Sequence, residues 1–377
     1  MKKLAVIFLT IAMMVSCAMP AFASENMSKG LLVQDYEMLN DASELGVQEI
    51  IYNIPSSYWY SQKDAIAWLV NEMSTRGFKV TIVVLKSIQG DGAIGANYAM
   101  FDEGDARLFD DIATTLGSRV QRYIVGNEVN NQQWNYAGNM ECIEYCEKYA
   151  KAFAAAYGAV KKANAAAEVY IPFDYGWYNE SNNANKYSGR EMLQRLSGML
   201  PKDMDWGIAW HPYPDPVGDP NFTDDAIATD DTYSNIVNFK NLHVLTDYMQ
   251  TAELLKADGT VRNLILSEQG FTSLSNGVVN EEAQAEYFRQ SWAIAKANPY
   301  VKAYLLSRQV DSRSEKNQGW AFGLWNNDMS AAQDDKASSK KLIWQVFKDI
   351  NTVSAGAVSD AGVSTNGQGV ALIGPGM

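Results

Sequence analysis

Residues 122–126 read RYIVG, residues 141–165 read ECIEYCEKYAKAFAAAYGAVKKANA, and residues 168–173 read EVYIPF. The two short runs are apolar and rich in β-branched and aromatic residues, which is typical of strands, whereas the long stretch between them has helical spacing of its apolar residues. A strand, a helix and a second strand in this order form a βαβ unit with parallel strands. This stretch therefore predicts an α/β fold.

The same alternation continues from residue 29 to residue 350 and gives eight units. The predicted strands are 30–34, 47–53, 79–85, 122–126, 168–173, 205–210, 263–267 and 301–307. The predicted helices are 36–45, 62–76, 103–116, 141–165, 189–200, 232–256, 280–297 and 338–350. Ser61 with Asp64 resembles a capping box, and Asn280 precedes two glutamates at a helix start. Eight units favour a single (β/α)₈ TIM barrel.

A doubly wound open sheet is the competing architecture. It would normally carry a glycine-rich phosphate turn after its first strand, but residues 34–37 read QDYE. The barrel is therefore preferred, as one domain covering residues 24–351. Residues 352–377, rich in Gly, Ala, Ser and Val, are expected to form a flexible tail.

The first residues have the pattern of a signal peptide over residues 1–23. Lys2 and Lys3 precede an apolar run over 4–15, and Ala21-Phe22-Ala23 has the small-x-small form that signal peptidase cleaves. Residues 14–17, MVSC, resemble a lipoprotein box that would lipidate Cys17, but Met is a poor match to that pattern. We expect a secreted or extracytoplasmic protein, cleaved after Ala23.

The formal net charge of −13 argues against nucleic acid and anionic membrane surfaces as partners. No later stretch has the roughly 20 consecutive apolar residues of a membrane span. Cys142 and Cys146, four residues apart in a predicted helix, are expected to be free buried thiols. We expect a monomer.

Two glutamates directly end predicted strands of the barrel. Glu128 follows Gly126-Asn127, and Glu268 follows Ser267. The chemistry of a (β/α)₈ barrel lies at the carboxyl ends of its strands, where two partly desolvated carboxylates push their pKa values apart. One group can then stay protonated while the other is ionised, as glycoside hydrolysis requires. Glu128 and Glu268 are therefore the predicted catalytic pair.

Aromatic and polar side chains cluster in the loops that follow these strands. Such a rim can stack on the CH faces of sugar rings and bind their hydroxyl groups, although any single aromatic residue could simply pack its loop against the barrel. For Asp174, binding a sugar hydroxyl and closing a loop hydrogen bond are both open. The predicted substrate-binding residues are Asn127, Trp134, Asp174, Trp177, His211, Tyr213, Arg308, Trp320 and Trp325.

Asn-Glu closing the fourth strand and Glu closing the seventh resemble the retaining (β/α)₈ glycoside hydrolases of clan GH-A. More narrowly, the sequence is similar to a group of bacterial secreted barrel proteins known mainly as a domain of unknown function, at residues 125–130 (VGNEVN), 211–214 (HPYP), 241–248 (NLHVLTDY) and 267–271 (SEQGF).

The clan resemblance implies roles for several of these residues. Glu128 would be the general acid/base, Glu268 the nucleophile, and Asn127 a ligand of the sugar 2-hydroxyl. His211 and Tyr213 match positions that orient the two carboxylates. Arg308 is our own addition, as a partner of Glu268.

The sequence departs from the commonest clan form beside Asn-Glu and at the end of the eighth strand. Gly126 and Val129 replace an aromatic residue and a proline, and Arg308 follows Ser307 where many members have Trp. Trp320 or Trp325 could supply that aromatic platform instead.

The sequence therefore predicts a glycosidase that cleaves β-linked oligo- or polysaccharides by a retaining mechanism, with its two carboxyl groups about 5 to 5.5 Å apart. The alternative is a barrel that binds glycans without cleaving them. No cofactor and no metal are expected, because the chain has two histidines and no His-x-x-x-His pair. The acid-rich residues 215–231 are expected to form a solvated loop, with a structural calcium site as the alternative.

Overall fold

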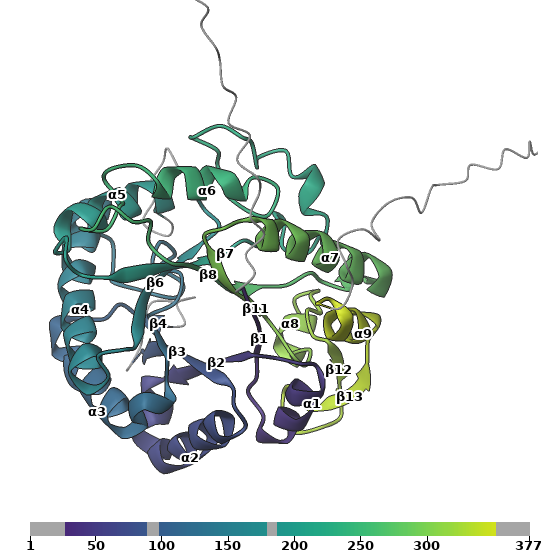
Figure 1. The fold of residues 1–377 in the computed structure, drawn as a ribbon. Helices are drawn as coiled ribbons and strands as arrows, with labels where there is room; N and C mark the ends of the chain where they lie inside the picture. The colour runs from purple at the N-terminus through teal and green to yellow at the C-terminus, as the bar shows by residue number, and fades with distance from the viewer. Residues whose placement is uncertain (1–26, 89–97, 179–186, 352–377) are drawn as a thin grey trace, which may run out of the picture.

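The computed structural model describes residues 27–88, 98–178 and 187–351, so the predicted signal peptide and the predicted tail lie outside the described residues. Eight parallel strands form a closed barrel at the centre (Figure 1). Going round the barrel they are β1 (Ser28–Leu32), β2 (Glu49–Pro55), β3 (Lys79–Ser87), β5 (Arg122–Val125), β6 (Glu168–Asp174), β7 (Trp206–His211), β8 (Leu264–Gln269) and β11 (Val301–Leu306). β11 pairs with β1 and closes the circle, which confirms the TIM barrel.

Helices surround the barrel as an outer ring (Figure 1). They are α1 (Leu39–Glu44), α2 (Ser56–Thr75), α3 (Ala106–Leu116), α4 (Cys142–Ala163), α5 (Gly189–Met199), α6 (Leu242–Met249), α7 (Glu281–Ala297) and α9 (Leu342–Asp349). Shorter elements lie within the loops. They are β4 (Tyr98–Ala99), the hairpin of β9 (Leu274–Ser275) and β10 (Val278–Val279), α8 (Arg313–Lys316), and the hairpin of β12 (Trp325–Asn327) and β13 (Ala337–Lys340).

Three helix predictions were wrong in extent. Of the predicted helix 338–350, residues 338–340 belong to strand β13 and the helix begins only at Leu342. The predicted helix 62–76 begins earlier, at Ser56, and Gln62 is a kink inside it, so Ser61 is no cap and its hydroxyl donates to the Ser57 carbonyl. The predicted helix 232–256 shrinks to α6. The Asn241 amide donates to the carbonyls of Thr229 and Ile236, which holds the preceding residues in a loop. Asn280 is confirmed as the N-cap of α7, because its side chain accepts from Ala283 N at 2.9 Å.

The apolar core has two layers, one inside the barrel and one between the barrel and the helices. The inner layer fills the barrel with side chains, so the barrel is a packed core and not a pore. Its buried members are Leu32, Ile51, Val83, Leu85, Ile124, Tyr170, Ala209, Ile265, Ala303 and Leu305.

Buried charges close the amino end of the barrel. Arg122 Nε lies 2.9 Å from Glu168 Oε2, and the Arg122 guanidinium also bonds to Glu49. All three residues stand at strand starts, so paired charges and their hydrogen bonds fill this end. The carboxyl end of the barrel is left for chemistry.

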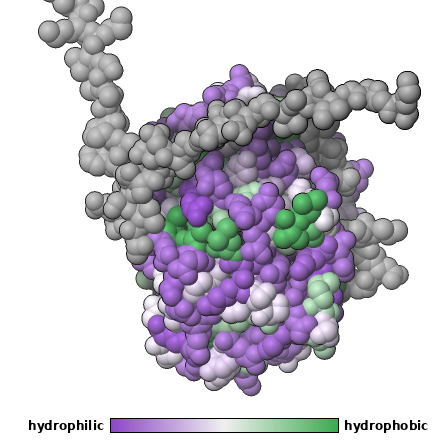
Figure 2. Space-filling view, turned by 90° about the vertical axis from the view of Figure 1, so that its right-hand side faces the viewer, coloured by the Kyte–Doolittle hydropathy of each residue, from purple (hydrophilic) through white to green (hydrophobic). Residues whose placement is uncertain are grey.

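The surface polarity and the state of the cysteines in the described residues agree with what the sequence predicts. Figure 2 shows a mostly hydrophilic face on which apolar side chains form small separate groups. In residues 27–88, 98–178 and 187–351 no helix has both the length and the apolar character to cross a bilayer. Cys142 and Cys146 are free and buried, as expected.

Candidate active site

Glu128, His211 and Glu268 meet at the carboxyl ends of β5, β7 and β8. One ligating atom from each of the three lies within 4.8 Å of the other two. His211 Nδ1 is 3.0 Å from Glu128 Oε1 and 4.0 Å from Glu268 Oε2. The barrel thus brings together two carboxylates and an imidazole that are up to 140 positions apart in the chain, and the imidazole lies within reach of both acids.

The turn that presents Glu128 is held in an unusual backbone conformation. Gly126 has φ +87° and Glu128 has φ +44°, a left-handed conformation that costs a residue with a side chain on the order of 1–3 kcal/mol. The Asn135 amide donates to the Asn127 carbonyl, and the Tyr149 hydroxyl donates to the Val125 carbonyl at 2.7 Å. These buried contacts fix the direction in which Glu128 enters the barrel mouth.

We expect Gly126→Ala to destabilise the fold by about 2 kcal/mol and to lower the activity of the site. An added Cβ would lie 2.6 Å from Asn135 Oδ1, and the left-handed φ is unfavourable for alanine. The free energy of unfolding in urea measures the effect. Gly138→Ala is the matched control, because Gly138 has φ +84° but nothing within 4 Å of an added Cβ. Equal losses in the two variants would show that crowding by Asn135 does not matter.

A pair of side-chain amide and carboxylate groups joins the Glu128 turn to the end of β6. Asn130 Nδ2 donates to Asp174 Oδ1 at 2.6 Å, and Asp174 N donates to Asn130 Oδ1 at 2.9 Å. Gly176 N also donates to Asp174 Oδ1. Asp174 was expected either to bind a sugar hydroxyl or to close a loop hydrogen bond, and these contacts are those of loop closure.

One contact of Glu128 was not predicted from the sequence. Asn131 Nδ2 lies 3.3 Å from Glu128 Oε2, on the carboxylate oxygen that does not face His211. The left-handed turn at Glu128 bends the chain so that a residue three positions later reaches back to the carboxylate. The glycine at 126 was the only sign of such a turn in the sequence.

Glu268 is held by Tyr213, whose hydroxyl donates to Glu268 Oε1 at 3.1 Å. Desolvation raises the pKa of Glu268 above its usual range, and the charges of Glu128 and Glu315 raise it further, while His211 and the Tyr213 hydrogen bond lower it. Burial lowers the pKa of His211, which keeps the imidazole neutral. The site thus combines two acids with a neutral hydrogen-bonding base.

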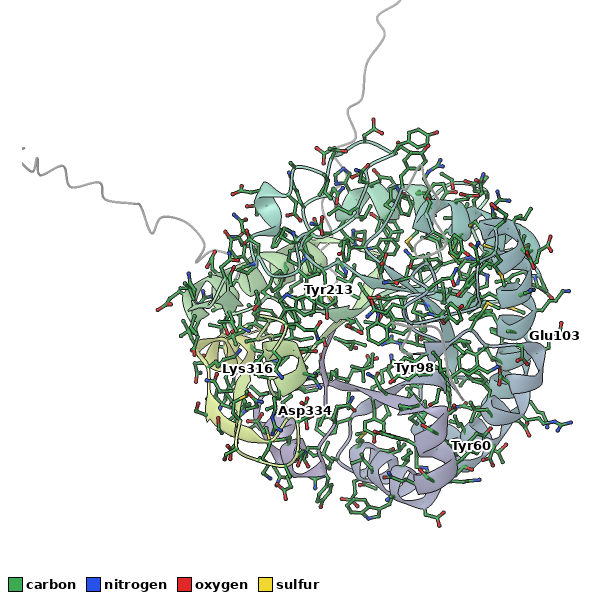
Figure 3. The ribbon with its side chains drawn as sticks, turned by 180° about the vertical axis from the view of Figure 1, so that it is seen from behind. Tyr60, Tyr98, Glu103, Tyr213, Lys316 and Asp334 are labelled. Carbon is green, nitrogen blue, oxygen red and sulfur yellow. The ribbon has the colours of Figure 1, made fainter. Side chains whose placement is uncertain are left out.

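Two of the tryptophans predicted to bind substrate, Trp134 and Trp320, are half-buried and pack on other aromatic rings. The Trp134 ring stacks on Tyr98 with centroids 5.9 Å apart. Trp320 packs on Phe322 at 6.2 Å, and Phe322 packs on Tyr213 at 5.8 Å, so this line of rings ends beside Glu268. Figure 3 shows Tyr98 and Tyr213 inside the ring of helices.

Asn127 is buried next to Glu128. Within the part of the chain that the structure describes, its side-chain amide makes no hydrogen bond, although its carbonyl accepts one from Asn135. The amide is therefore available to a ligand in the barrel mouth.

Three of the predicted substrate-binding residues face other partners. Trp177 is fully buried, donates from Nε1 to the Thr232 carbonyl and packs on Trp210, so it cannot contact a ligand. Trp325 donates from Nε1 to Asp41 Oδ2 at 3.0 Å and is turned toward α1.

Arg308 is the third. Its Nη1 lies 3.0 Å from Glu315 Oε1, so its partner is Glu315 and not Glu268. The Arg308 side chain also lines a small polar pocket with Gln34, Asp35 and Asp335, at the ends of β1 and β11. The prediction of a direct pair with Glu268 was wrong, because the loop after β11 supplies a nearer carboxylate.

Comparisons with known proteins agree with the barrel. A family model described as "Family of unknown function (DUF5722)" matches residues 109–369. A family 1 β-glucosidase from Thermotoga maritima in complex with isofagomine lactam superimposes with a TM-score of 0.56 at 12% identity, covering 84% of this chain and 85% of that chain. A second structure, described as a family 1 β-glucosidase from the same organism, gives a TM-score of 0.54 at 14% identity with the same coverage. A search of curated proteins finds no match.

The two β-glucosidases are so distant in sequence that their likeness concerns the fold alone. The family model covers more than half of the sequence. The chain belongs to the DUF5722 family.

Proposed function

We propose that this protein is a glycoside hydrolase that cleaves β-linked glycans with retention of configuration. The observation that carries the proposal is the approach of Glu128 and Glu268, whose nearest ligating oxygens lie within 4.8 Å in the mouth of the barrel. Retaining enzymes hold their carboxyl groups about 5 to 5.5 Å apart, whereas inverting enzymes need about 6.5 to 9.5 Å to admit a water molecule. The short separation favours direct attack by one carboxylate.

In the first step, Glu268 attacks the anomeric carbon and forms an ester bond to the sugar. The glycosidic C–O bond breaks, and the proton of Glu128 passes to the leaving oxygen. In the second step, Glu128 takes a proton from a water molecule, which attacks the anomeric carbon and frees Glu268. Tyr213 orients the nucleophile, and His211 bonds to the acid/base.

The substrate and the compartment are part of the same proposal. The Trp320, Phe322 and Tyr213 rings supply an apolar wall beside Glu268. Asn127 supplies an amide for the sugar 2-hydroxyl. The leader pattern of residues 1–23 favours export, so the substrate would be an oligo- or polysaccharide outside the cytoplasm.

The test is hydrolysis of a panel of plant, fungal and bacterial polysaccharides and aryl β-glycosides, followed by NMR of the first anomer released. We expect cleavage of at least one substrate with release of the β-anomer. Release of the α-anomer would refute the retaining mechanism. Binding without cleavage across the panel would favour the non-catalytic glycan-binding barrel.

We expect Tyr213→Phe to shift the acidic limb of the kcat/KM profile upward by about one pH unit. The nucleophile must be ionised, so activity falls as the pH drops through the pKa of Glu268. The Tyr213 hydrogen bond lowers that pKa, and its loss raises it. Tyr304→Phe is the control, because its hydroxyl bonds to Ser291 and not to a carboxylate. An unchanged acidic limb in Tyr213→Phe would contradict this role.

A further inference from the structure

The Glu128, His211 and Glu268 side chains have the donor set of a transition-metal site. One imidazole nitrogen and two carboxylate oxygens converge, which leaves a fourth position open to solvent or substrate, as in zinc sites with three protein ligands. We propose that these three residues bind a divalent transition-metal ion of the zinc class, and that the ion competes with the glycan for the barrel mouth.

One distance already suits a zinc ion, whereas Glu268 has to move toward the other two ligands, because the three ligating atoms are as much as 4.8 Å apart. Zinc bonds of about 2.0 to 2.2 Å place tetrahedral ligands about 3.4 Å apart. His211 Nδ1 and Glu128 Oε1 are already 3.0 Å apart, and Glu268 Oε2 is 4.0 Å from the same nitrogen. Glu268 is the one that has to approach. Its side chain is 31% exposed, against 10% for Glu128 and 2% for His211, so the ligand with most freedom is the one that must move.

Hydrogen bonds from neighbouring residues orient the two carboxylates so that one oxygen of each faces His211. Tyr213 donates to Glu268 Oε1, so Oε2 is the oxygen nearer His211. Asn131 donates to Glu128 Oε2, so Oε1 faces His211. Outer hydrogen bonds of this kind orient the ligands of metal sites.

The donor set predicts selectivity among ions. Mixed nitrogen and oxygen ligands favour copper(II) and zinc, whereas calcium and magnesium take six or more oxygen ligands. Binding needs only the three side chains. That the bound ion blocks hydrolysis rests on the proposed function, because the ion would occupy both carboxylates that the reaction uses.

Calorimetric titration of the full chain with zinc chloride tests the site. We expect His211→Asn and Glu268→Gln each to weaken binding at least about 100-fold, while folding, checked by thermal unfolding, is retained in at least the partly exposed Glu268→Gln. His243→Asn is the matched control, because His243 is the only other histidine of the chain and lies 3.5 Å from Asp230. It should bind zinc like the unchanged protein. Binding that survives in both site variants, or is lost in His243→Asn, overturns the proposal.

Two further measurements separate the metal site from the proposed function. The visible absorption of added cobalt(II) should show a low-coordinate site in the unchanged protein and lose that signature in Glu268→Gln. Zinc should also inhibit hydrolysis competitively, with recovery on adding a chelator. Zinc binding without any glycosidase activity would support the site and refute the proposed function. Hydrolysis that is indifferent to saturating zinc would refute the competition and leave the proposed function standing.

Discussion

Glu268→Gln is expected to lower kcat/KM by about 10⁴-fold or more, whatever the leaving group of the substrate. The amide cannot form the ester bond to the anomeric carbon. Glu128 cannot replace Glu268, because in the proposed mechanism it is needed on the leaving oxygen. The loss should appear in kcat with both aryl glycosides and natural glycans. Steady-state kinetics on the best substrate of the panel measures it.

Glu128→Gln provides the contrast that separates the two roles. The fall in kcat/KM should be large for a glycan, whose leaving oxygen needs a proton. It should be much smaller for formation of the intermediate from an aryl glycoside, because an acidic phenol leaves without protonation. Glu282→Gln, at an exposed position of α7, is the control and should retain full activity. If Glu268→Gln keeps more than about 1% of the activity, Glu268 is not the nucleophile.

The barrel itself was predictable because its strands are encoded locally. All eight predicted strands match observed ones to within two residues at both ends. These segments are short, apolar and rich in β-branched residues. Because both faces of such a strand are buried, its sequence is an almost unbroken apolar run, which is easy to identify. The predicted helix 232–256 failed because polar side chains hold its first part in a loop. Asn241 donates to the Thr229 carbonyl and Ser234 to the Ile236 carbonyl, and the apolar pattern of the sequence does not reveal these bonds.

The approach of Glu128 and Glu268 was predictable for a related reason. A residue at the end of a parallel strand must enter the barrel mouth, so Glu128 and Glu268 could be brought together without knowledge of any loop. Residues further into the loops could not be placed in this way. Asp41 of α1 accepts from the indoles of Trp325 and Trp344, which turns Trp325 away from the mouth. Loop side chains are directed by such contacts between distant segments.

Lys341→Met is expected to destabilise the protein by about 3–5 kcal/mol. Lys341 Nζ lies 2.9 Å from Asp311 Oδ1, 3.0 Å from Ser273 Oγ and 3.1 Å from the Ala321 carbonyl. Lys341 and Asp311 are both fully buried, so removing the ammonium leaves the interior carboxylate with only the longer contact to Lys316 as an ion pair. Urea unfolding measures the loss.

Lys316→Met is the matched control. Its Nζ lies 3.6 Å from the other oxygen of Asp311, but its side chain is 22% exposed, and we expect a loss below about 1 kcal/mol. A double variant, Lys341→Met with Asp311→Leu, should recover part of the stability, because no buried charge then remains. The Lys341 contacts join the loops after β8 and β11, and the second of these loops carries Trp320 and Phe322 toward Tyr213. Equal stability of Lys341→Met and Lys316→Met would show that the buried ion pair contributes no more to stability than the partly exposed one.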